Sequence, residues 1–549
     1  MKQLYIADCL DVLIDLNKKY PEGLIDLIYI DPPFNSKRNY NVLFEDISMK
    51  EAKAQRQAFS DTWSNVSYID TLNNIDSLNK DLFDFLKTLN KINISKSAVS
   101  YLTIMSIRIY YMHKLLKDTG SFYLHCDPTM SHYLKVICDL IFGDKKKGYK
   151  NEIVWKRTSS LKTSQFTDKK FGVSTDIILF FTKSEDYYFN SEAIKIPFSS
   201  KDVEGHYPFS DNKGPFTKSP LFRSMGMGER PNLCYEYKGV NAPSKAGWKI
   251  SLEKLKKLDI EDDIDWTNPK LPYRKFRPTH TKGWLVSNLW LDIEQTSGNE
   301  RLGYPTQKPE ALLERIIKAS TRESDVIADF FCGCGTSVAV ANRLNRDWIG
   351  VDISHLAIKL IIDRLTKPLS IESRTQFIKD IEIHGFPKDI ASAKELARKD
   401  NKGRFEFQDW IVEFLLGGIL NPKKSADGGW DGYISFHKSE KEKGNIFIEV
   451  KSGHVGVKNI REFINVVETN EVDLGVFVCF QEELTKPMEQ AAKETGKYKG
   501  YQFDIIQIIT IEDLLEGKFI KMPGGVESST FKQATKDVRP EKSIKRNLF

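Results

Sequence analysis

The sequence predicts an α/β protein built around a doubly wound, parallel sheet. Short β-rich runs at residues 3–8 and 24–30 flank a segment of helical character. Strand and helix patterns alternate again between residues 309 and 365, and a turn containing Gly333 and Gly335 joins one of these strands to the next helix. Strands that alternate with helices pair in parallel, because each connecting helix packs back onto a face of the sheet.

Hydrophobic periodicity assigns the elements in chain order. Residues 8–20 have helical spacing, and residues 48–118 are mostly helical in character. The amphipathic segment 100–120 ends at Gly120, a suitable helix cap, and residues 120–127 form a strand that ends in polar residues. The second half predicts a helix at 309–321, a strand at 325–331, a helix at 336–345, a strand at 347–354 and a helix at 355–365.

Length and composition indicate a multidomain globular protein. The chain has 549 residues, 40% hydrophobic and 28% charged, which is typical of folded domains. Its start does not resemble a signal peptide, and no apolar run approaches the roughly 20 residues that span a bilayer. Only Cys332 and Cys334 of the seven cysteines lie close together, which argues against a disulfide framework or a zinc site. We therefore expect a cytoplasmic protein without membrane contacts.

Changes of pattern predict the domain boundaries. Between residues 151 and 300 the helix–strand alternation breaks up, and Gly, Pro, Lys and aromatic residues are frequent. We expect a first domain at 1–375 that contains this irregular region. A polar, charged stretch at 376–404 predicts a linker, 405–523 a second compact unit, and 524–549 a basic, disordered tail.

A strong local charge lies between Lys145 and Lys170, where nine basic and two acidic residues give a net charge of +7. Tyr149, Trp155 and Phe166 are interleaved with these charges. Such a cluster is typical of a surface that binds a polyanion. Taken alone, the run fits a solvated, lysine-rich face equally well.

The segment DFFCGCGTS predicts a nucleoside-binding turn. Gly333 and Gly335 let the backbone turn tightly, so a ligand can lie against the main chain. The next strand ends at Asp352, 23 residues after Asp329, where a carboxylate can bind ribose hydroxyls. Because a P-loop lysine and a third glycine are absent, a nucleoside cofactor fits better than a dinucleotide.

The segment LIYIDPPFN is the most specific pattern in the chain. An apolar strand delivers Asp31 to its carboxyl end, where open α/β sheets bind ligands. Pro32 and Pro33 fix φ and lack N–H donors, so the backbone can present carbonyl groups outward. Asp31 and the Pro32 carbonyl can accept both N–H bonds of an exocyclic amine on a planar base stacked on Phe34. Asp-Pro-Pro by itself also fits a surface turn.

Together the two motifs resemble the amino-methyltransferases of DNA, whose catalytic motif is (D/N/S)-P-P-(Y/F/W) and whose cofactor motif is F-x-G-x-G. YPTQKPEALLERII at 304–317 resembles the helix-opening motif before the cofactor strand of that family. LYIADCLDVL resembles the segment whose acid, here Asp8, contacts the adenine of the cofactor. The catalytic motif precedes the cofactor motif, as in the β group of the family. The resemblance covers nearly all of residues 1–370, and Phe330 departs from the Pro usual at its position.

The resemblance implies S-adenosylmethionine as cofactor and double-stranded DNA as partner, with the target base flipped out of the duplex. It implies a target-recognition region at 151–300, with the basic run at its entrance, which favours the polyanion interpretation. The implied catalytic residues are Asp31, Pro32, Pro33 and Phe34. The implied cofactor contacts are Asp8, Pro305, Thr306, Gln307, Lys308, Asp329, Phe331, Gly333, Gly335, Thr336 and Asp352.

The C-terminal unit predicts a β-hairpin formed by GGWDGYISF and IFIEVKSG. Pairing the two strands about residue 441 sets Asp431 opposite Lys451. The side chains of Glu449 and Lys451 point to the same face of their strand. Two carboxylates and a lysine at one end of a sheet can hold Mg²⁺ and orient a water. The pattern resembles the D…E-x-K core of PD-(D/E)xK nucleases, and with DGGWDG at 427–432 it is similar to Mrr-type restriction endonuclease domains. Asp431 and Glu449 are then the metal ligands.

The sequence thus predicts an adenine-N6 DNA methyltransferase of a restriction–modification or phage-defence system, acting as a homodimer or with partner subunits, and with its own endonuclease. A cytosine-N4 methyltransferase is the alternative within the same class, although Asp31 favours adenine. A nuclease that uses residues 1–370 only to sense DNA is an alternative of another class. A third is a DNA-binding adaptor without catalytic activity.

Overall fold

The computed structural model describes residues 1–33, 68–92, 96–143, 148–158, 171–268, 270–296, 300–302, 307–367, 377, 380–385, 387, 389–421, 428–438, 443–516 and 518–523. The chain divides into two compact units, one made of Met1–Phe189 and Asn288–Phe549, the other of Asn190–Ser287. Within the described ranges, no helix is both long and apolar enough to cross a membrane.

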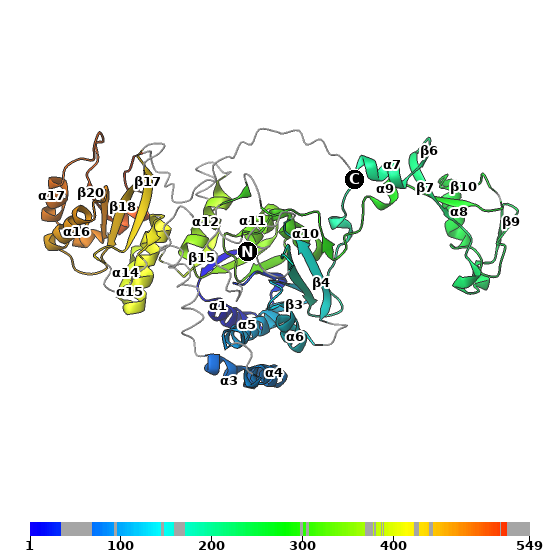
Figure 1. Ribbon diagram of the computed structural model, residues 1–549, viewed down its shortest axis with the longest axis horizontal. Coiled ribbons are helices and arrows are strands. Elements are labelled where there is room, and N and C mark those ends of the chain that lie inside the picture. Colours follow the sequence, from blue (N-terminus) through cyan, green and yellow to red (C-terminus); the bar gives the residue numbers. More distant parts are fainter. Residues whose placement is uncertain are drawn as a thin grey trace. The chain divides into compact units, whose positions relative to one another are not determined.

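A nine-stranded sheet forms the centre of the first unit (Figure 1). Its order is β12-β4-β5-β3-β2-β13-β14-β1-β15, and all neighbours are parallel except β5, which runs antiparallel to both β3 and β4. The strands are β1 (Lys2–Ile6), β2 (Ile25–Ile30), β3 (Leu116–Cys126), β4 (Tyr149–Lys156), β5 (Thr175–Thr182), β12 (Leu289–Trp290), β13 (Val326–Asp329), β14 (Asp347–Asp352) and β15 (Glu382–His384).

Helices cover both faces of this sheet, which confirms the doubly wound α/β prediction. Ile28, Ala328 and Ile349 face one core together with residues of α1, α5 and α6. Leu27 and Trp348, one residue before Ile28 and Ile349, are also buried and point to the opposite face, where α10, α11 and α12 pack (Figure 1). The helices are α1 (Cys9–Lys19), α3 (Tyr68–Leu78), α4 (Lys80–Lys91), α5 (Lys96–Leu115), α6 (Ser131–Phe142), α10 (Glu310–Ser320), α11 (Thr336–Arg343) and α12 (His355–Thr366).

The region 151–300, predicted to be irregular throughout, contributes three strands to this sheet. Most of β4, all of β5 and β12 lie within it, so the separate unit is shorter, Asn190–Ser287. The run IILFF in β5 is buried between two neighbouring strands. A short apolar run of this kind has no period that distinguishes a central strand from other buried segments.

The second unit contains a small antiparallel sheet of order β10-β11-β7-β6 and a hairpin, β8–β9. Its core forms around Trp248, which is fully buried with Leu255 and Phe222. Arg277 bonds to both Asp211 (2.7 Å) and Asp263 (2.9 Å). The elements are α7 (Ser200–His206), β6 (Phe209–Asp211), β7 (Gly214–Pro220), β8 (Glu236–Tyr237), β9 (Val240–Asn241), α8 (Leu252–Ile260), β10 (Ile264–Asp265), β11 (Tyr273–Phe276) and α9 (Pro278–Thr281), with 3-10 turns η2 (Glu192–Ile194), η3 (Met225–Met227) and η4 (Pro231–Leu233).

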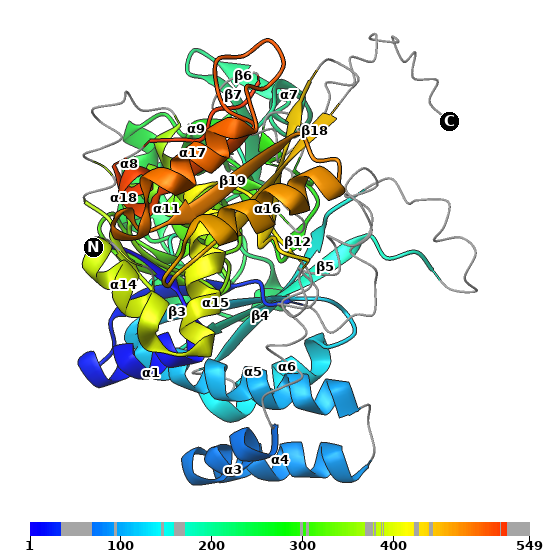
Figure 2. The same cartoon turned by 90° about the vertical axis from the view of Figure 1, so that its left-hand side faces the viewer.

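The C-terminal domain contains a five-stranded sheet of order β16-β17-β18-β19-β20. The β17–β18 hairpin is antiparallel, whereas β18, β19 and β20 are parallel. Alternate residues of β19 face two different cores, one with residues of α14 and α15 and one with residues of α16 and α17. Figure 2 shows α16 and α17 in front of this sheet. The elements are α14 (Ile390–Lys399), α15 (Asn401–Asp409), the π-helix η6 (Trp410–Leu415), β16 (Ile419–Leu420), β17 (Gly432–His437), β18 (Lys443–Val450), α16 (Val457–Thr469), β19 (Leu474–Cys479), η7 (Gln481–Glu483), α17 (Lys486–Glu494), β20 (Ile506–Thr510) and α18 (Ile511–Leu515).

Part of the stretch predicted as a linker, 376–404, is an integral helix of this domain. Ala393 and Ala397 of α14 are buried in its core, and Asp389 caps the helix through a bond from the Ser392 N–H (2.8 Å). The polar composition of the stretch conceals this helix, because the residues that it buries fully are alanines, while Ile390 and Leu396 pack against the core only in part.

Candidate functional site

Four aspartates gather at one edge of the central sheet. Asp31 follows β2, Asp329 ends β13, Asp352 ends β14 and Asp8 lies two residues after β1. These four strands are neighbours and all parallel, so their carboxyl ends meet at the same edge. The structure therefore brings together the acids that the sequence selected from four separate segments, at the edge where open α/β sheets bind ligands.

The glycine turn after β13 is tied to the end of β14. The Gly333 N–H donates to Asp352 Oδ2 (2.9 Å), and the Ser354 N–H donates to Asp352 Oδ1 (2.9 Å). Gly333 and Gly335 have φ of +49° and +71°, values that favour glycine. A Cβ at Gly335 would overlap the side chain of Ile361 on α12, so the turn lies directly against that helix.

Asp329 and Asp352 are buried carboxyl groups that resist ionisation. Burial raises the pKa of Asp329 to about 7, and the nearby charges of Asp31 and Asp352 add to this effect. Burial likewise raises the pKa of Asp352 to about 6. The Ser337 hydroxyl bonds to Asp329 (2.5 Å), and the Phe331 N–H donates to the same carboxylate (3.0 Å). Perturbed acids that share one site are typical of functional positions.

The two oxygens of Asp31 have different surroundings. Oδ2 forms an ion pair with Lys308, which lies just before α10. Oδ1 is buried and has no hydrogen-bond partner among the described residues. A buried acceptor without a donor is costly, so this oxygen is suited to a donor from a ligand. Pro32 and Pro33 follow directly, whereas Phe34 lies outside the described residues.

A buried hydrogen-bond chain supports the same edge. The Tyr29 hydroxyl lies 3.0 Å from His125 Nδ1, and His125 Nε2 lies 3.3 Å from Asp176 Oδ2. Arg157 approaches the other oxygen of Asp176 (3.7 Å). Although burial opposes ionisation, the bond from His125 and the nearby cations hold the pKa of Asp176 below its usual value. Tyr29 is two residues before Asp31, so the chain fixes the strand that carries it.

Asp8 is held by a residue that the sequence did not single out. Arg108 of α5 donates from Nη2 to both of its oxygens (2.7 and 2.8 Å), and the Leu10 N–H donates to Oδ1 (2.8 Å). The Arg108 side chain is only 8% exposed. An arginine within an otherwise apolar helix signals a buried ion pair, but its partner, 100 residues away, could not be inferred from the sequence.

The remaining predicted cofactor residues have structural partners of their own. Gln307 donates to the Glu300 carbonyl (2.7 Å) and accepts from the Leu302 N–H (2.8 Å), so it secures the preceding loop. The Thr336 hydroxyl, at the start of α11, accepts a bond from Arg364 (3.1 Å). Pro305 and Thr306 lie outside the described residues.

The basic run predicted to bind a polyanion is described only in part, because Lys145, Lys146, Lys147, Lys162, Lys169 and Lys170 lie outside the described residues. Trp155 within it is buried and donates to the Ile293 carbonyl (2.9 Å). Its aromatic ring is therefore part of the fold.

In the C-terminal domain, the predicted acidic and basic residues meet at the end of the hairpin. Asp431 Oδ2 accepts from the Val450 N–H (2.7 Å), between Glu449 and Lys451. Lys451 forms an ion pair with Glu449 (2.5 Å), whose side chain is 10% exposed. Gln408 of α15, which the sequence analysis missed, donates to Asp431 Oδ1 (3.2 Å). Within the described ranges there is no cluster of three or more metal-ligating side chains, but Mg²⁺ often takes only one or two carboxylates and keeps its waters.

The hairpin register differs from the predicted one. Gly432 pairs with Ile448, and the Asp431 N–H donates to the Ile448 carbonyl (2.7 Å). Asp431 therefore lies across from Glu449 and not from Lys451, because the strands pair about residue 440 rather than 441. In the observed register the carboxylates of Asp431 and Glu449 are therefore closer together than in the predicted register.

Comparisons with known proteins identify two parts of the chain. The family model for DNA methylases matches residues 25–363, and the model for restriction endonucleases matches residues 405–516. Both matches agree with the resemblances found in the sequence.

Individual relatives match the first part. The Type II methyltransferase M.EcaI of Enterobacter cloacae is 32% identical over 49% of this chain and 58% of its own length, so the chain spans little more than half of that relative. The DNA adenine methyltransferase YhdJ of Escherichia coli is 25% identical over 65% of this chain and 80% of its own. The solved structure of PvuII DNA methyltransferase, cytosine-N4-specific, has 14% identity and a TM-score of 0.36, and covers 70% of this chain and 95% of its own.

Replacing Gly335 by alanine should destabilise the first unit more than the left-handed backbone alone explains. The backbone conformation costs about 1–2 kcal/mol, and overlap with Ile361 should add about 1–3 kcal/mol. Gly496→Ala is the control, because Gly496 also has a positive φ (+86°) but meets no described atom within 4 Å of an added Cβ. Urea unfolding measures both variants. Equal losses of unfolding free energy would contradict the close contact between the turn and α12.

Proposed function

Because the chain belongs to the DNA methylase family, we propose that it transfers a methyl group from S-adenosylmethionine to the exocyclic N6 amine of adenine in double-stranded DNA. The observation that carries this proposal is the buried Oδ1 of Asp31, an acceptor without a partner among the described residues, at the edge of the sheet where three further carboxylates converge.

The residues around Asp31 suit an exocyclic amine. Oδ1 accepts one N–H of the amine, and the carbonyl of Pro32 accepts the other, which draws the nitrogen lone pair out of conjugation with the ring. Lys308, paired with Oδ2, holds the carboxylate in place. Phe34 is proposed to stack on the flipped base, whose extrusion from the duplex costs a few kcal/mol.

The other acids and the glycine turn suit the cofactor, which supplies an electrophilic methyl group when bound. Asp352 and Asp329 are acceptors for ribose hydroxyls, and Gly333 and Gly335 allow the main chain to approach the ligand. Asp8, held by Arg108, is proposed to contact the adenine ring. Phe331, Thr336 and the 305–308 segment are proposed to complete the site. Donors from the ligand would offset the unfavourable burial that raises the pKa of Asp329 and Asp352.

Two observations favour adenine over cytosine as the target. The catalytic motif begins with Asp31, whereas cytosine-amine enzymes of this family more often begin it with Ser. The E. coli relative bears the name DNA adenine methyltransferase. Cytosine N4 is the alternative, since both bases present the same kind of amine to the same acceptors.

A second proposed activity is cleavage of DNA by the C-terminal restriction endonuclease domain. Asp431 and Glu449 lie opposite each other on paired strands and can hold Mg²⁺, which would activate a water and stabilise charge on the phosphate. Lys451, paired with Glu449, is placed to orient that water. One polypeptide would then both mark DNA and cut unmarked DNA, on its own or with partner subunits.

Asp31→Ala should abolish methyl transfer and leave S-adenosylmethionine binding almost unchanged, because the carboxylate faces the base. Asp15→Ala, at an exposed acid of α1 (79% exposed side chain), is the control and should retain activity. Transfer is measured with labelled cofactor, and mass analysis of the nucleosides identifies the product. Retained methylation in Asp31→Ala would remove this residue from catalysis. Methylcytosine without methyladenine would refute the adenine assignment, and a protein that binds no cofactor would support the adaptor alternative.

Binding of S-adenosylmethionine should weaken in two steps as the pH falls, through about 7 for Asp329 and through about 6 for Asp352. The pKa of Asp352 is about 6 in the folded protein, above its ordinary value, so the carboxylate is lost below this pH. Protonation removes the charge and turns one oxygen into an O–H donor, which weakens acceptance from the Gly333 N–H and from the proposed ribose hydroxyl. Affinity should then fall about tenfold per pH unit. Calorimetry from pH 5 to 8 tests this. In Asp352→Asn, the plot of affinity against pH should lack the inflection near pH 6. If the inflection persists in this variant, it belongs to another titrating group.

Glu449→Ala should abolish Mg²⁺-dependent cleavage of unmethylated plasmid without reducing methylation. Ca²⁺ should not support cleavage, because its looser coordination misplaces the reacting groups. The control is Glu462→Ala, an exposed acid of α16, which should cut normally. If pure protein cuts neither unmethylated nor pre-methylated plasmid, the nuclease proposal fails. Equal cutting of both, lost in Glu449→Ala, would keep the nuclease but reject protection by its own methyl mark.

A further inference from the structure

A pocket of about 400 Å³ lies in the C-terminal domain, immediately beyond the proposed nuclease residues. Ser452, Gly453 and His454, which follow β18, form one part of its lining, and Phe480, Glu482 and Glu483, which follow β19, form another. Because β18 and β19 are parallel neighbours, the pocket lies at the carboxyl ends of two adjacent strands. The chain enters it one residue after Lys451.

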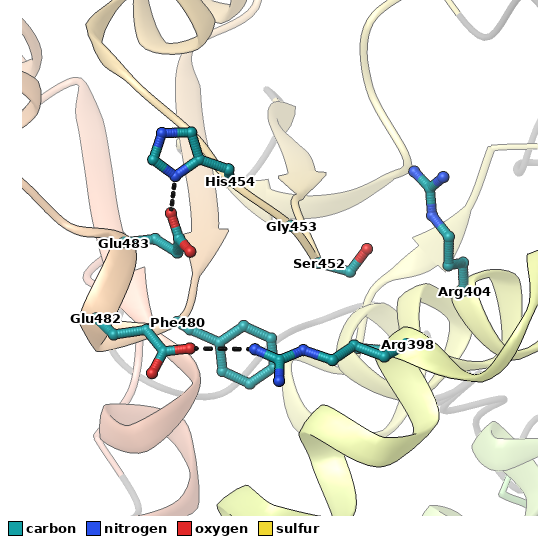
Figure 3. A pocket seen from close by; sticks show the side chains of 9 residues that line it. Arg398, Arg404, Ser452, Gly453, His454, Phe480, Glu482 and Glu483 are labelled. Carbon is teal, nitrogen blue, oxygen red and sulfur yellow. Dashed lines mark hydrogen bonds and ion pairs between the residues drawn. The ribbon is translucent and has the colours of Figure 1, made fainter.

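Two arginines from the helices before the hairpin form the opposite wall. Arg398 lies in the last turn of α14, and Arg404 lies on α15. Figure 3 shows Arg398 reaching across the pocket towards Glu482, while the Ser452 hydroxyl points to the side on which Arg404 lies. The floor is rigid and apolar, since Phe480 is buried and stacks on Phe407, with 5.6 Å between ring centroids.

The charged groups in the pocket are unequally paired. Glu482 is bonded by both Lys394 (2.6 Å) and Arg398 (3.4 Å), and Glu483 is bonded by His454 (2.8 Å). Arg404 is exposed, and its guanidinium has no hydrogen bond or ion pair within the described part of the chain. The pocket lining therefore holds two arginines and two glutamates, and Arg404 is the one of these four without a partner among the described residues.

We propose that this pocket binds a phosphate group of the DNA backbone adjacent to the phosphate that is cut, with Arg404 as its main contact. The inference rests on the proposed nuclease function and assigns a substrate contact to it. A guanidinium binds phosphate oxygens through two parallel hydrogen bonds, and the Ser452 hydroxyl supplies a neutral donor. Arg398, fixed by Glu482, contributes positive charge without being free to fold over the site.

The position of the pocket favours DNA over a free anion. Ser452 is the next residue after Lys451, and Lys451 contacts Glu449, so the pocket opens beside the proposed cleavage site along the direction of the strand. Neighbouring phosphates of one DNA strand lie several ångströms apart, so an anion site beside the cleavage site would meet the next phosphate of the same strand. Such contacts position the backbone and carry no sequence information.

The salt dependence of DNA binding tests the proposal without requiring cleavage. Full-length protein is titrated onto a duplex in Ca²⁺ at several KCl concentrations. Removing one phosphate contact lowers the slope of log K against log salt by about 1, and Arg404→Ala should also weaken binding by about three- to tenfold at moderate salt. Arg404→Lys should recover most of the slope but not all of the affinity. Arg461→Ala, at an exposed arginine on α16 that does not line the pocket, should leave both unchanged.

A second variant should act in the opposite direction. Glu482→Gln keeps the shape of the wall but removes its negative charge, so DNA binding should tighten by a similar factor. Glu449→Ala is measured in the same assay to separate the two proposals. If the wild type does not cut DNA but Arg404→Ala lowers the slope, the pocket is a phosphate site and the nuclease proposal fails. If the slope and affinity are unchanged in Arg404→Ala, the phosphate proposal is refuted whether or not the protein cuts DNA.

Discussion

The structure of the first unit depends on one constraint, which is the gathering of four carboxyl groups, two of them buried, at one edge of a sheet. Asp8, Asp31, Asp329 and Asp352 end, or closely follow, neighbouring parallel strands, and water cannot solvate all of them. Each is handled differently. Arg108 neutralises Asp8 and Lys308 neutralises Asp31, whereas Asp329 and Asp352 are surrounded by hydroxyl and main-chain donors. Among the described residues the last two have no ion-pair partner, and burial raises their pKa.

The same constraint accounts for the arrangement of the elements around the edge. The Gly333 N–H reaches Asp352 only because the turn after β13 bends with a positive φ, which in turn sets the start of α11 against α12. The antiparallel strand β5 delivers Asp176 to the carboxyl ends of β2 and β3, where it meets His125. Had β5 been parallel to β3, Asp176 would lie at the far end of the sheet and Tyr29 and His125 would lose their buried partner.

The C-terminal domain also places charged residues at the ends of strands, but it has fewer of them. Its polar residues also gather where strands end, with Asp431 before β17, Glu449 near the end of β18 and the pocket residues beyond β18 and β19. Here each acid has a specific partner, since Asp431 is bonded to the main chain of Val450 and Glu449 to Lys451. The two domains therefore use strand ends as the place where reactive groups are held against a rigid sheet, although their strand orders and connections differ.

The sequence by itself determined the local features of this protein. The order of strands and helices from 309 to 365, the aspartate before two prolines and the glycine turn are all encoded in short segments whose periodicity or backbone requirements are independent of distant residues. The sequence also predicted that these strands form a hairpin, but it placed the centre of pairing at residue 441, whereas the structure has it at residue 440. The reason is that loop residues, which carry no hydrophobic alternation, fix the centre.

Only the tertiary structure decided which distant residues meet. Lys308 contacts Asp31 across 277 positions, Arg108 contacts Asp8 across 100, and Gln408 reaches Asp431 across 23. Such contacts depend on the strand order and on which helix covers which face, and neither is contained in local periodicity. The helix α14 was hidden for a related reason, since its alanines become a core only when the domain surrounds them. The chemistry of each group could be predicted from its segment, but its partner is set by the fold.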